Sequence, residues 1–443
     1  MKTIKILLLL ISFICFLFSS DSINKNKKQN IDFILDNHSK IIVDLKLGEI
    51  NYSIVNKNNQ DFLRLNIDNA YHSNTPGLPE FPQINNLIEI PSGSTYYIEV
   101  INDQSIEYSL DEISENIKIF PSQPSISKSE NIDNISFIID EWVYSQDKYI
   151  NSNLIEITEK GKMRETQIGN LIINPFEYNP QKNKLIIHTD IKFAVHFENI
   201  NFELTNQIKE KYSSVYFEPV LSGSLLNYNS TLSRNNDFIE DKVTYLIIAN
   251  QSFQGYLDEF IQWKTQKGFD VITAYTNEIG SSAASIRAYI QEQYLNPPDN
   301  LSPISFVLIV GDTQQIPASY SSGGHVSDLD YCDMGNDNIP DVLCGRFSAE
   351  TPTHLLTQID KTIQYEKYEM PNPSFLEDVI LISGVDASYA PTYGNGQINY
   401  GNEYYFNSSN NINSQTFLYP ESGSSGSQIL NLANQGASFI NYT

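Results

Sequence analysis

The chain has 443 residues, of which 40% are hydrophobic and 12% aromatic, which is typical of a globular protein with two or three domains. Asp and Glu outnumber Lys and Arg by 53 to 28, so the formal net charge is −25. Such a chain repels phosphate backbones and anionic lipid headgroups, which excludes nucleic acid as an expected partner. The excess of acidic residues either keeps the protein soluble, which we favour, or supplies oxygen ligands for hard cations such as calcium.

Residues 1–20 are predicted to be a secretory signal peptide. Two lysines precede an apolar run from Ile6 to Phe18, and Ser19–Ser20 supply the small residues that suit cleavage. The run is shorter than the roughly 20 residues that a spanning helix needs. We therefore expect a protein that is secreted, outside the cell or at its surface, without a transmembrane anchor. Cys332 and Cys344 would then be the only thiols of the mature chain.

Residues 21–226 are predicted to form a β-rich domain, most simply a sandwich of antiparallel strands. Runs with period-two alternation, such as Ile41–Leu45 and Tyr96–Val100, are separated by Asn, Gly and Pro. Arg164 lies in a loop-like basic stretch that could reach an active-site cleft, although an ordinary exposed loop is the commoner explanation. Residues 227–241 are polar and turn-rich, which predicts a linker.

After the linker, strands alternate with helices, which predicts parallel sheets. We divide this part into a first subdomain, residues 242–370, and a second subdomain, residues 371–443. The predicted strands include Tyr245–Ala249, Phe306–Val310, Val379–Ser383 and a final strand, Ala437–Tyr442, that is expected to be buried. In open α/β sheets the chemistry lies beyond the carboxyl ends of the strands, so the residues that follow these strands are the candidates for function.

An acidic loop runs from Asp328 to Asp341 and carries five carboxylates among Gly and Asn residues. Hard cations bind six to eight oxygens from side chains and main-chain carbonyls, so such a loop suits calcium. The spacing is not that of an EF-hand, and a solvated acidic turn is the alternative.

Several motifs, taken in order, resemble the gingipain-type cysteine peptidases. Gly77–Pro82 and Asn174–Pro180 resemble the pro-segment of that family. The segments that resemble its catalytic domain are Val310–Asp312, Gly345–Glu350, Gln358–Glu366 and Asn441–Thr443. The resemblance implies a β-sandwich-like pro-domain that chaperones and inhibits an α/β catalytic domain of the caspase-like fold.

In that family, Asn-Tyr-Thr is followed by Gly-His-Gly, whose His is the general base, and further on by the nucleophilic Cys. Neither motif is present here. A thiolate attacks a carbonyl only when a nearby imidazole takes its proton. We therefore expect a catalytic domain that is truncated at the C-terminus and inactive as it stands.

The resemblance carries over three sets of site residues. Asp386 matches the acidic residue that orients the His. Calcium would be bound by the carbonyls of Met334 and Ile339 and by the carboxylates of Asp337 and Asp341. Gln397 falls, by an ungapped count from Asp386, where arginine-specific members have an Asp at the base of the specificity pocket, and this substitution argues against Arg specificity because no charge compensates a desolvated guanidinium.

The expected function is therefore a secreted cysteine-type endopeptidase that acts on proteins or peptides and is made as a zymogen inhibited by its own pro-domain. Two alternatives stay open. A sortase-like transpeptidase of the same family would act in protein secretion and prefer an amine acceptor over water. A non-catalytic, calcium-binding surface module is the second alternative.

Overall fold

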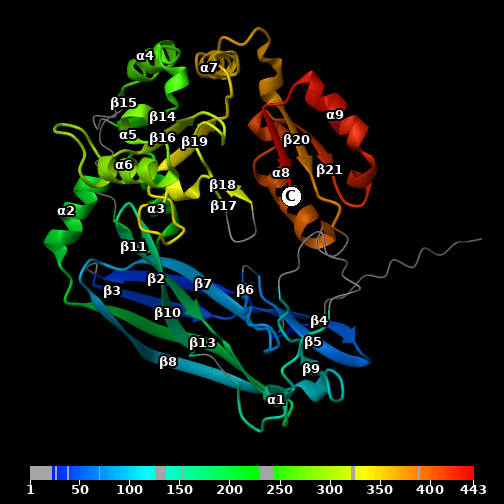
Figure 1. Ribbon diagram of the computed structural model, residues 1–443. Helices are drawn as coiled ribbons and strands as arrows, with labels where there is room; N and C mark the ends of the chain where they lie inside the picture. Colours follow the sequence, from blue (N-terminus) through cyan, green and yellow to red (C-terminus); the bar gives the residue numbers. More distant parts are fainter. Residues whose placement is uncertain are drawn as a thin grey trace, which may run out of the picture.

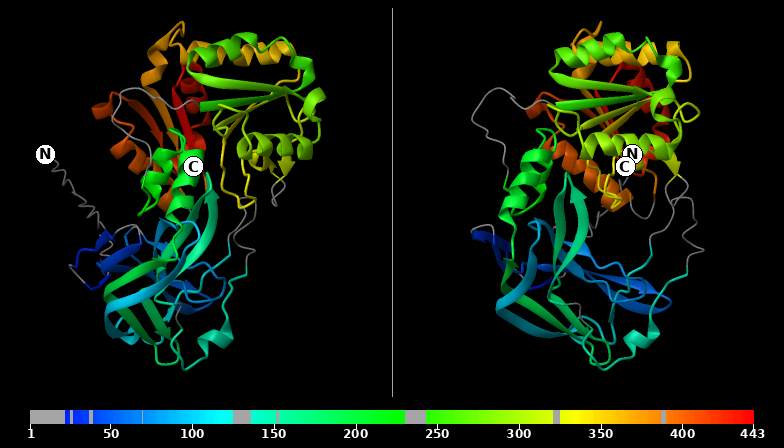
Figure 2. Two further views of the ribbon diagram at one scale, coloured as in Figure 1. Left: turned by 90° about the vertical axis from the view of Figure 1, so that its left-hand side faces the viewer. Right: turned by 60° about the vertical axis from the view of Figure 1, so that its left-hand side comes forward.

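The computed structural model describes residues 22–24, 27–36, 39–68, 70–124, 136–150, 153–229, 243–320, 325–386 and 390–443. The predicted signal peptide and most of the predicted linker lie outside these residues. A β-rich region forms the lower part of the molecule in Figure 1, and two α/β units lie side by side above it, as the views of Figure 2 also show. None of the helices within the described ranges has the length and apolar character needed to cross a membrane.

Three sheets enclose one hydrophobic core in the β-rich region. The first contains β1 (Ser22–Ile23), β4 (Ile50–Lys57), β5 (Gln60–Asn66) and β9 (Lys118–Ile119). The second contains β10 (Ile155–Met163), β11 (Thr166–Ile173), β7 (Pro82–Glu89) and β6 (Tyr71–His72). The third contains β12 (Phe176–Asn179), β13 (Lys184–Glu198), β3 (Lys40–Lys46), β2 (Asn30–Asp36) and β8 (Thr95–Ser109).

The pairings in these three sheets are antiparallel apart from β5 with β9. The expected antiparallel β structure is therefore confirmed over most of the region. The alternation of apolar and polar residues explains these strands, because in β3 every second residue (Ile41, Val43, Leu45) is buried in the common core.

Helices end the β-rich region, which the sequence pattern did not predict. The two helices at its end are α2 (Phe202–Tyr212) and α3 (Glu218–Ser224). A third, short helix, α1 (Glu141–Tyr144), lies earlier in the region. The side chain of Asn201 caps α2 by accepting the N–H of Leu204. Aromatic rings of α2 and of the segment between α2 and α3 contact the first α/β unit: Tyr212 lies 5.1 Å from Tyr294, and Tyr216 lies 4.7 Å from Phe306 (ring centroids).

The first α/β unit is a parallel sheet of order β15-β14-β16-β19 with helices on both faces. Its strands are β14 (Val243–Ala249), β15 (Phe269–Tyr275), β16 (Phe306–Val310) and β19 (Leu343–Phe347), with a small hairpin of β17 (Ser319–Tyr320) and β18 (Val326–Ser327). Its helices are α4 (Asp258–Gln266), α5 (Thr276–Ile279), α6 (Ala283–Leu295) and α7 (Pro352–Glu366). Alternate residues of β14 face opposite sides of the sheet and pack against different helices. Leu246 packs with α6, while Ile247 packs with α4 and α7.

The second α/β unit is a parallel sheet of order β21-β20-β22. Its strands are β20 (Asp378–Ile382), β21 (Asn413–Phe417) and β22 (Phe439–Tyr442), and its helices are α8 (Asn395–Tyr404) and α9 (Gly426–Gln435). The expectation that the final strand is buried is wrong. Within the described chain β22 pairs only with β20, so it is an edge strand, and Phe439 and Tyr442 are 47% and 64% exposed.

Candidate active site at the carboxyl edge of the second sheet

The carboxyl ends of β20 and β22 are held together by main-chain hydrogen bonds. In the parallel register Ile382 faces Tyr442, and the N–H of Thr443 donates to the carbonyl of Ile382 at 3.1 Å. Past the strand ends, the N–H of Gly384 donates to the carbonyl of Thr443 at 2.9 Å. The segment that leaves β20 and the end of β22 therefore meet at one point of the sheet edge, where open α/β folds bind their ligands.

Two glycines leave room at this junction. A Cβ on Gly384 would collide with the carbonyl oxygen of Thr443, and a Cβ on Gly394 would lie 2.6 Å from the Oγ of Ser383 and 3.2 Å from the Oγ1 of Thr443. Both hydroxyls are buried and have no hydrogen-bond partner in the described part of the chain. Buried polar atoms are normally paired, so this edge presents two hydroxyls that a ligand could satisfy. The sequence pattern had only placed Ser383 at the end of a strand.

In the chain, Asp386 lies between these two glycines and Gln397 follows Gly394. Asp386 follows Gly384 by two residues, is half-buried, and accepts the N–H of Ala390 at its main-chain carbonyl at 2.8 Å. Gln397 lies in the first turn of α8, which follows a π-helical turn at Ala390–Gly394. Its side chain is exposed, whereas the next residue, Ile398, is buried against β20.

The last part of the acidic loop lies at the amino edge of the first sheet, because its last residue, Asp341, comes just before β19. Asp337 accepts the N–H of Ile339 at 3.0 Å, and Asp341 accepts the N–H of Met334 at 3.0 Å. Asp341 is only 2% exposed, and burial raises the pKa of its carboxyl to about 6. Cys332 and Cys344 form a disulfide across the loop, so the expectation that they are thiols is wrong.

The chemistry of this donor set fits a hard cation. The loop offers only oxygens, a buried carboxylate would gain from a nearby positive charge, and each carboxylate oxygen that accepts one N–H keeps a second lone pair. Among the residues with described positions, no three His, Cys, Asp or Glu side chains are arranged to hold a metal. The carbonyls of Met334 and Ile339 would therefore have to complete the site.

Arg164 does not reach the carboxyl edge, so the idea that it enters the active-site cleft is wrong. It lies at the turn of the β10–β11 hairpin and is 2% exposed. Its Nε donates to the carbonyl of Tyr212 at 2.8 Å, and its Nη1 donates to the carbonyl of Ile304 at 2.6 Å. Ile304 and Asp341 precede β16 and β19, so the hairpin binds at the amino ends of the parallel strands.

At the carboxyl edge of the first sheet, Arg346 organises the loops. Its guanidinium donates to both carboxylate oxygens of Asp328, at 2.6 and 2.8 Å, and to the carbonyls of Gly311 and Ile316 at 2.8 and 3.0 Å. Asp312 accepts the hydroxyl of Ser348 at 2.7 Å, and this bond, with the N–H of Thr313, holds the pKa of its carboxyl below the ordinary value. Asp312 therefore has a local, loop-forming role.

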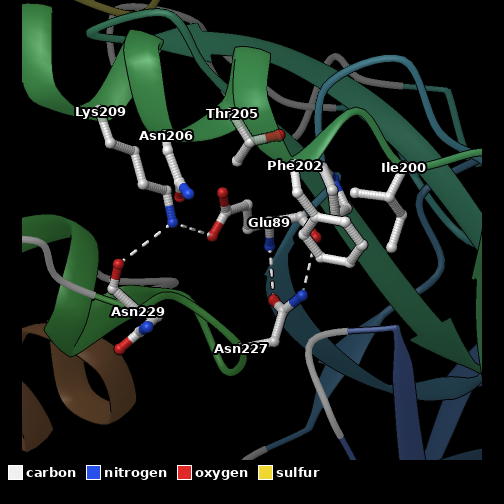
Figure 3. Close-up of a pocket in the computed structure, with 9 residues that line it drawn as sticks. Glu89, Ile200, Phe202, Thr205, Asn206, Lys209, Asn227 and Asn229 are labelled. Carbon is white, nitrogen blue, oxygen red and sulfur yellow. Dashed lines mark hydrogen bonds and ion pairs between the residues drawn. The ribbon is translucent and has the colours of Figure 1, made fainter.

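A cavity of about 260 Å³ lies in the β-rich region beside α2 (Figure 3). In its wall Lys209 donates to Glu89 at 2.8 Å and to the carbonyl of Asn229 at 3.2 Å. The side chain of Asn227 accepts the N–H of Glu89 at 2.7 Å and donates to its carbonyl at 2.9 Å. These contacts fix the first residues of the predicted linker to β7, which is a structural role.

Comparison with known proteins finds a matching family model for each half of the chain. The model of peptidase family C25 matches residues 239–443, and that of the family's propeptide matches residues 23–234. Lys-gingipain of Porphyromonas gingivalis is 30% identical over 399 residues, which cover 89% of this chain and 23% of the relative. Gingipain R2 of the same species is 25% identical over 369 residues, covering 83% of this chain and 49% of the relative.

A solved structure concerned with the zymogenic latency of gingipain K from Porphyromonas gingivalis matches at 24% identity with a TM-score of 0.38, over 40% of this chain and 98% of that one. The chain spans about a quarter of the length of the Lys-gingipain that it matches (23%). The two family models together account for most of the described residues. The chain therefore belongs to peptidase family C25, the gingipain-type cysteine peptidases, and carries the pro-domain of that family.

Proposed function

We propose that this protein is the zymogen of a secreted cysteine endopeptidase that cleaves proteins or peptides and is inhibited by its own pro-domain. One observation carries the proposal: the N–H of Gly384 binds the carbonyl of Thr443, so β22 ends beside the segment that bears Asp386. A histidine placed just after Thr443, as in the motif that the sequence resembles, would emerge at this point. Asp386 would orient its imidazole, and the imidazole would take the proton of a cysteine further along the chain.

Substrate preference is expected to differ from that of arginine-specific members. Gln397 is neutral and exposed in the first turn of α8. An amide does not compensate the desolvation of a guanidinium as a carboxylate does. We therefore propose that peptides with Arg before the scissile bond are poor substrates.

The test is a peptidase assay on the natural full-length protein after removal of its pro-domain. Peptide hydrolysis is expected, and alkylation with iodoacetamide is expected to abolish it because the nucleophile is a thiolate. An added amine should leave the product as the free acid, which separates hydrolysis from transpeptidation. Hydrolysis that survives alkylation would contradict a cysteine peptidase, and an amide product would favour the transpeptidase.

The acidic loop is proposed to hold calcium through the carbonyls of Met334 and Ile339 and the carboxylates of Asp337 and Asp341. Calcium at about 1 mM, the range in which extracellular modules bind it, is expected to raise the thermal midpoint of the full chain by roughly 2–4 °C. Magnesium should not replace it, because magnesium demands a stricter octahedral geometry. In Asp337→Asn the shift should disappear. An equal shift in that variant would place the metal elsewhere.

A further inference from the structure

The contact between the pro-domain and the acidic loop is centred on one buried cation. Arg164 donates to carbonyls of three separate segments, namely Tyr212, Ile304 and Asp341, at 2.8, 2.6 and 3.3 Å. The rings of Phe217 and Tyr294 each lie 5.3 Å from its guanidinium carbon. Desolvation lowers the pKa of this guanidinium, but Arg remains charged in proteins. A desolvated Arg among aromatic rings is typical of the residues that dominate the energy of an interface.

Main-chain groups of the same hairpin bind the carboxylates of the loop. The N–H of Lys162 donates to Asp337 at 2.7 Å, and the N–H of Arg164 donates to Asp341 at 2.8 Å. Hydrogen bonds to a carboxylate are stronger than those between neutral groups. Because the donors are main-chain groups, the loop recognises the shape of the hairpin rather than most of its side chains.

The shape of the hairpin depends on backbone that few residues adopt. Arg164 and Glu165 have φ values of 51° and 62°, and Gly161 has φ of 145°. A Cβ on Gly161 would lie 2.5 Å from the carboxylate of Asp337. Only glycine therefore lets the hairpin approach the loop this closely.

We propose that residues 332–341 of the acidic loop are the seat that retains the pro-domain after the linker is cut, with Arg164 as its anchor. The partner is the β10–β11 hairpin of this chain's own pro-domain. The seat lies at the amino ends of β16 and β19, whereas the candidate active site lies at the carboxyl end of β20. Retention of the pro-domain is therefore separable from events at the active site, and the inference does not depend on peptidase activity.

The experiment uses the full chain with a site for a sequence-specific protease inserted within residues 230–241. After cutting, gel filtration at decreasing concentration measures how far the two pieces dissociate, in the presence of a calcium chelator so that a bound metal does not contribute. The parent is expected to elute as one complex. Arg164→Ala is expected to weaken the association by about 100-fold, as loss of a central anchor does.

Lys162→Ala is the matched control. It removes a half-exposed side chain from the same hairpin but keeps the main-chain N–H that binds Asp337, so retention should stay at the parent level. Circular dichroism of each uncut variant checks its fold. Gly161→Ala is the second test if Arg164→Ala folds poorly, and about a 10-fold weakening is expected from the collision with Asp337. Retention equal to that of Lys162→Ala in a folded Arg164→Ala or Gly161→Ala chain would overturn the proposal.

Discussion

Replacing Lys209 by alanine is expected to lower the free energy of unfolding of the pro-domain by about 3–5 kcal/mol, the usual result of removing one partner of a buried ion pair. The side chains of Lys209 and Glu89 are only 7% and 8% exposed. The variant would remove the cation that pairs with the buried Glu89 carboxylate and the donor to the carbonyl of Asn229. Hydrogen exchange of the β7 amides measures the effect, because these amides open with the core of the pro-domain.

Two controls separate this effect from a general loss of charge. Lys192 pairs with Asp44 at 3.4 Å in the same domain, but the two side chains are 38% and 30% exposed. Lys192→Ala should therefore change the free energy of unfolding by less than about 1 kcal/mol. The double variant Lys209→Met with Glu89→Leu should recover most of the loss, since apolar pairs often replace buried ion pairs without cost. If Lys209→Ala is no worse than Lys192→Ala, the pair does not stabilise the domain.

Asp386→Asn is expected to lower kcat of the activated full-length peptidase by about 10³–10⁴-fold, with little change in KM, because an amide in this position orients the imidazole in the wrong tautomer. Asp386 acts through the histidine and is a positioning residue. The pH profile of kcat/KM should therefore also lose the inflection of the base. Steady-state kinetics over a pH series measures both effects.

Asp312→Asn is the matched control for this variant. Asp312 also follows a parallel strand, β16, but it binds Ser348 and its own loop, so activity near the parent level is expected. Gly384→Ala offers a steric test, since its Cβ would collide with the carbonyl oxygen of Thr443 and displace the end of β22. Parent-like kinetics in Asp386→Asn would remove Asp386 from the triad. Parent-like kinetics in Gly384→Ala would show that the junction is not needed.

Local patterns allowed much of the α/β fold to be predicted. The strand predicted at Phe306–Val310 is β16 residue for residue, because a buried parallel strand is a continuous apolar run. The starts of two helices also follow from local sequence, because a Ser or Thr stands directly before each helix. The side chains of Ser282 and Thr351 cap α6 and α7 by accepting N–H groups three residues on.

Features that depend on distant contacts could not be predicted. Alternation and hydrophobicity do not distinguish an edge strand from a central one, so β22 was expected to be buried. The environment of Arg164 comes from segments 48, 140 and 177 residues away, which no local pattern contains. At the candidate site, Asp386 and Gln397 came from family resemblance alone and their roles remain predictions. The junction of Gly384 with Thr443 needed the sheet register.

The disulfide between Cys332 and Cys344 has a consequence for the entropy of the acidic loop. It closes a covalent ring with a sequence separation of 12 that contains the whole seat of the hairpin. In the chain-entropy model, a ring of this size lowers the conformational entropy of the unfolded chain. This lowering stabilises the folded loop by about 3 kcal/mol. The seat is therefore restricted before the hairpin arrives, and docking orders less chain than it would in a reduced loop. A reducing environment would loosen the seat although none of the atoms that contact the hairpin would change.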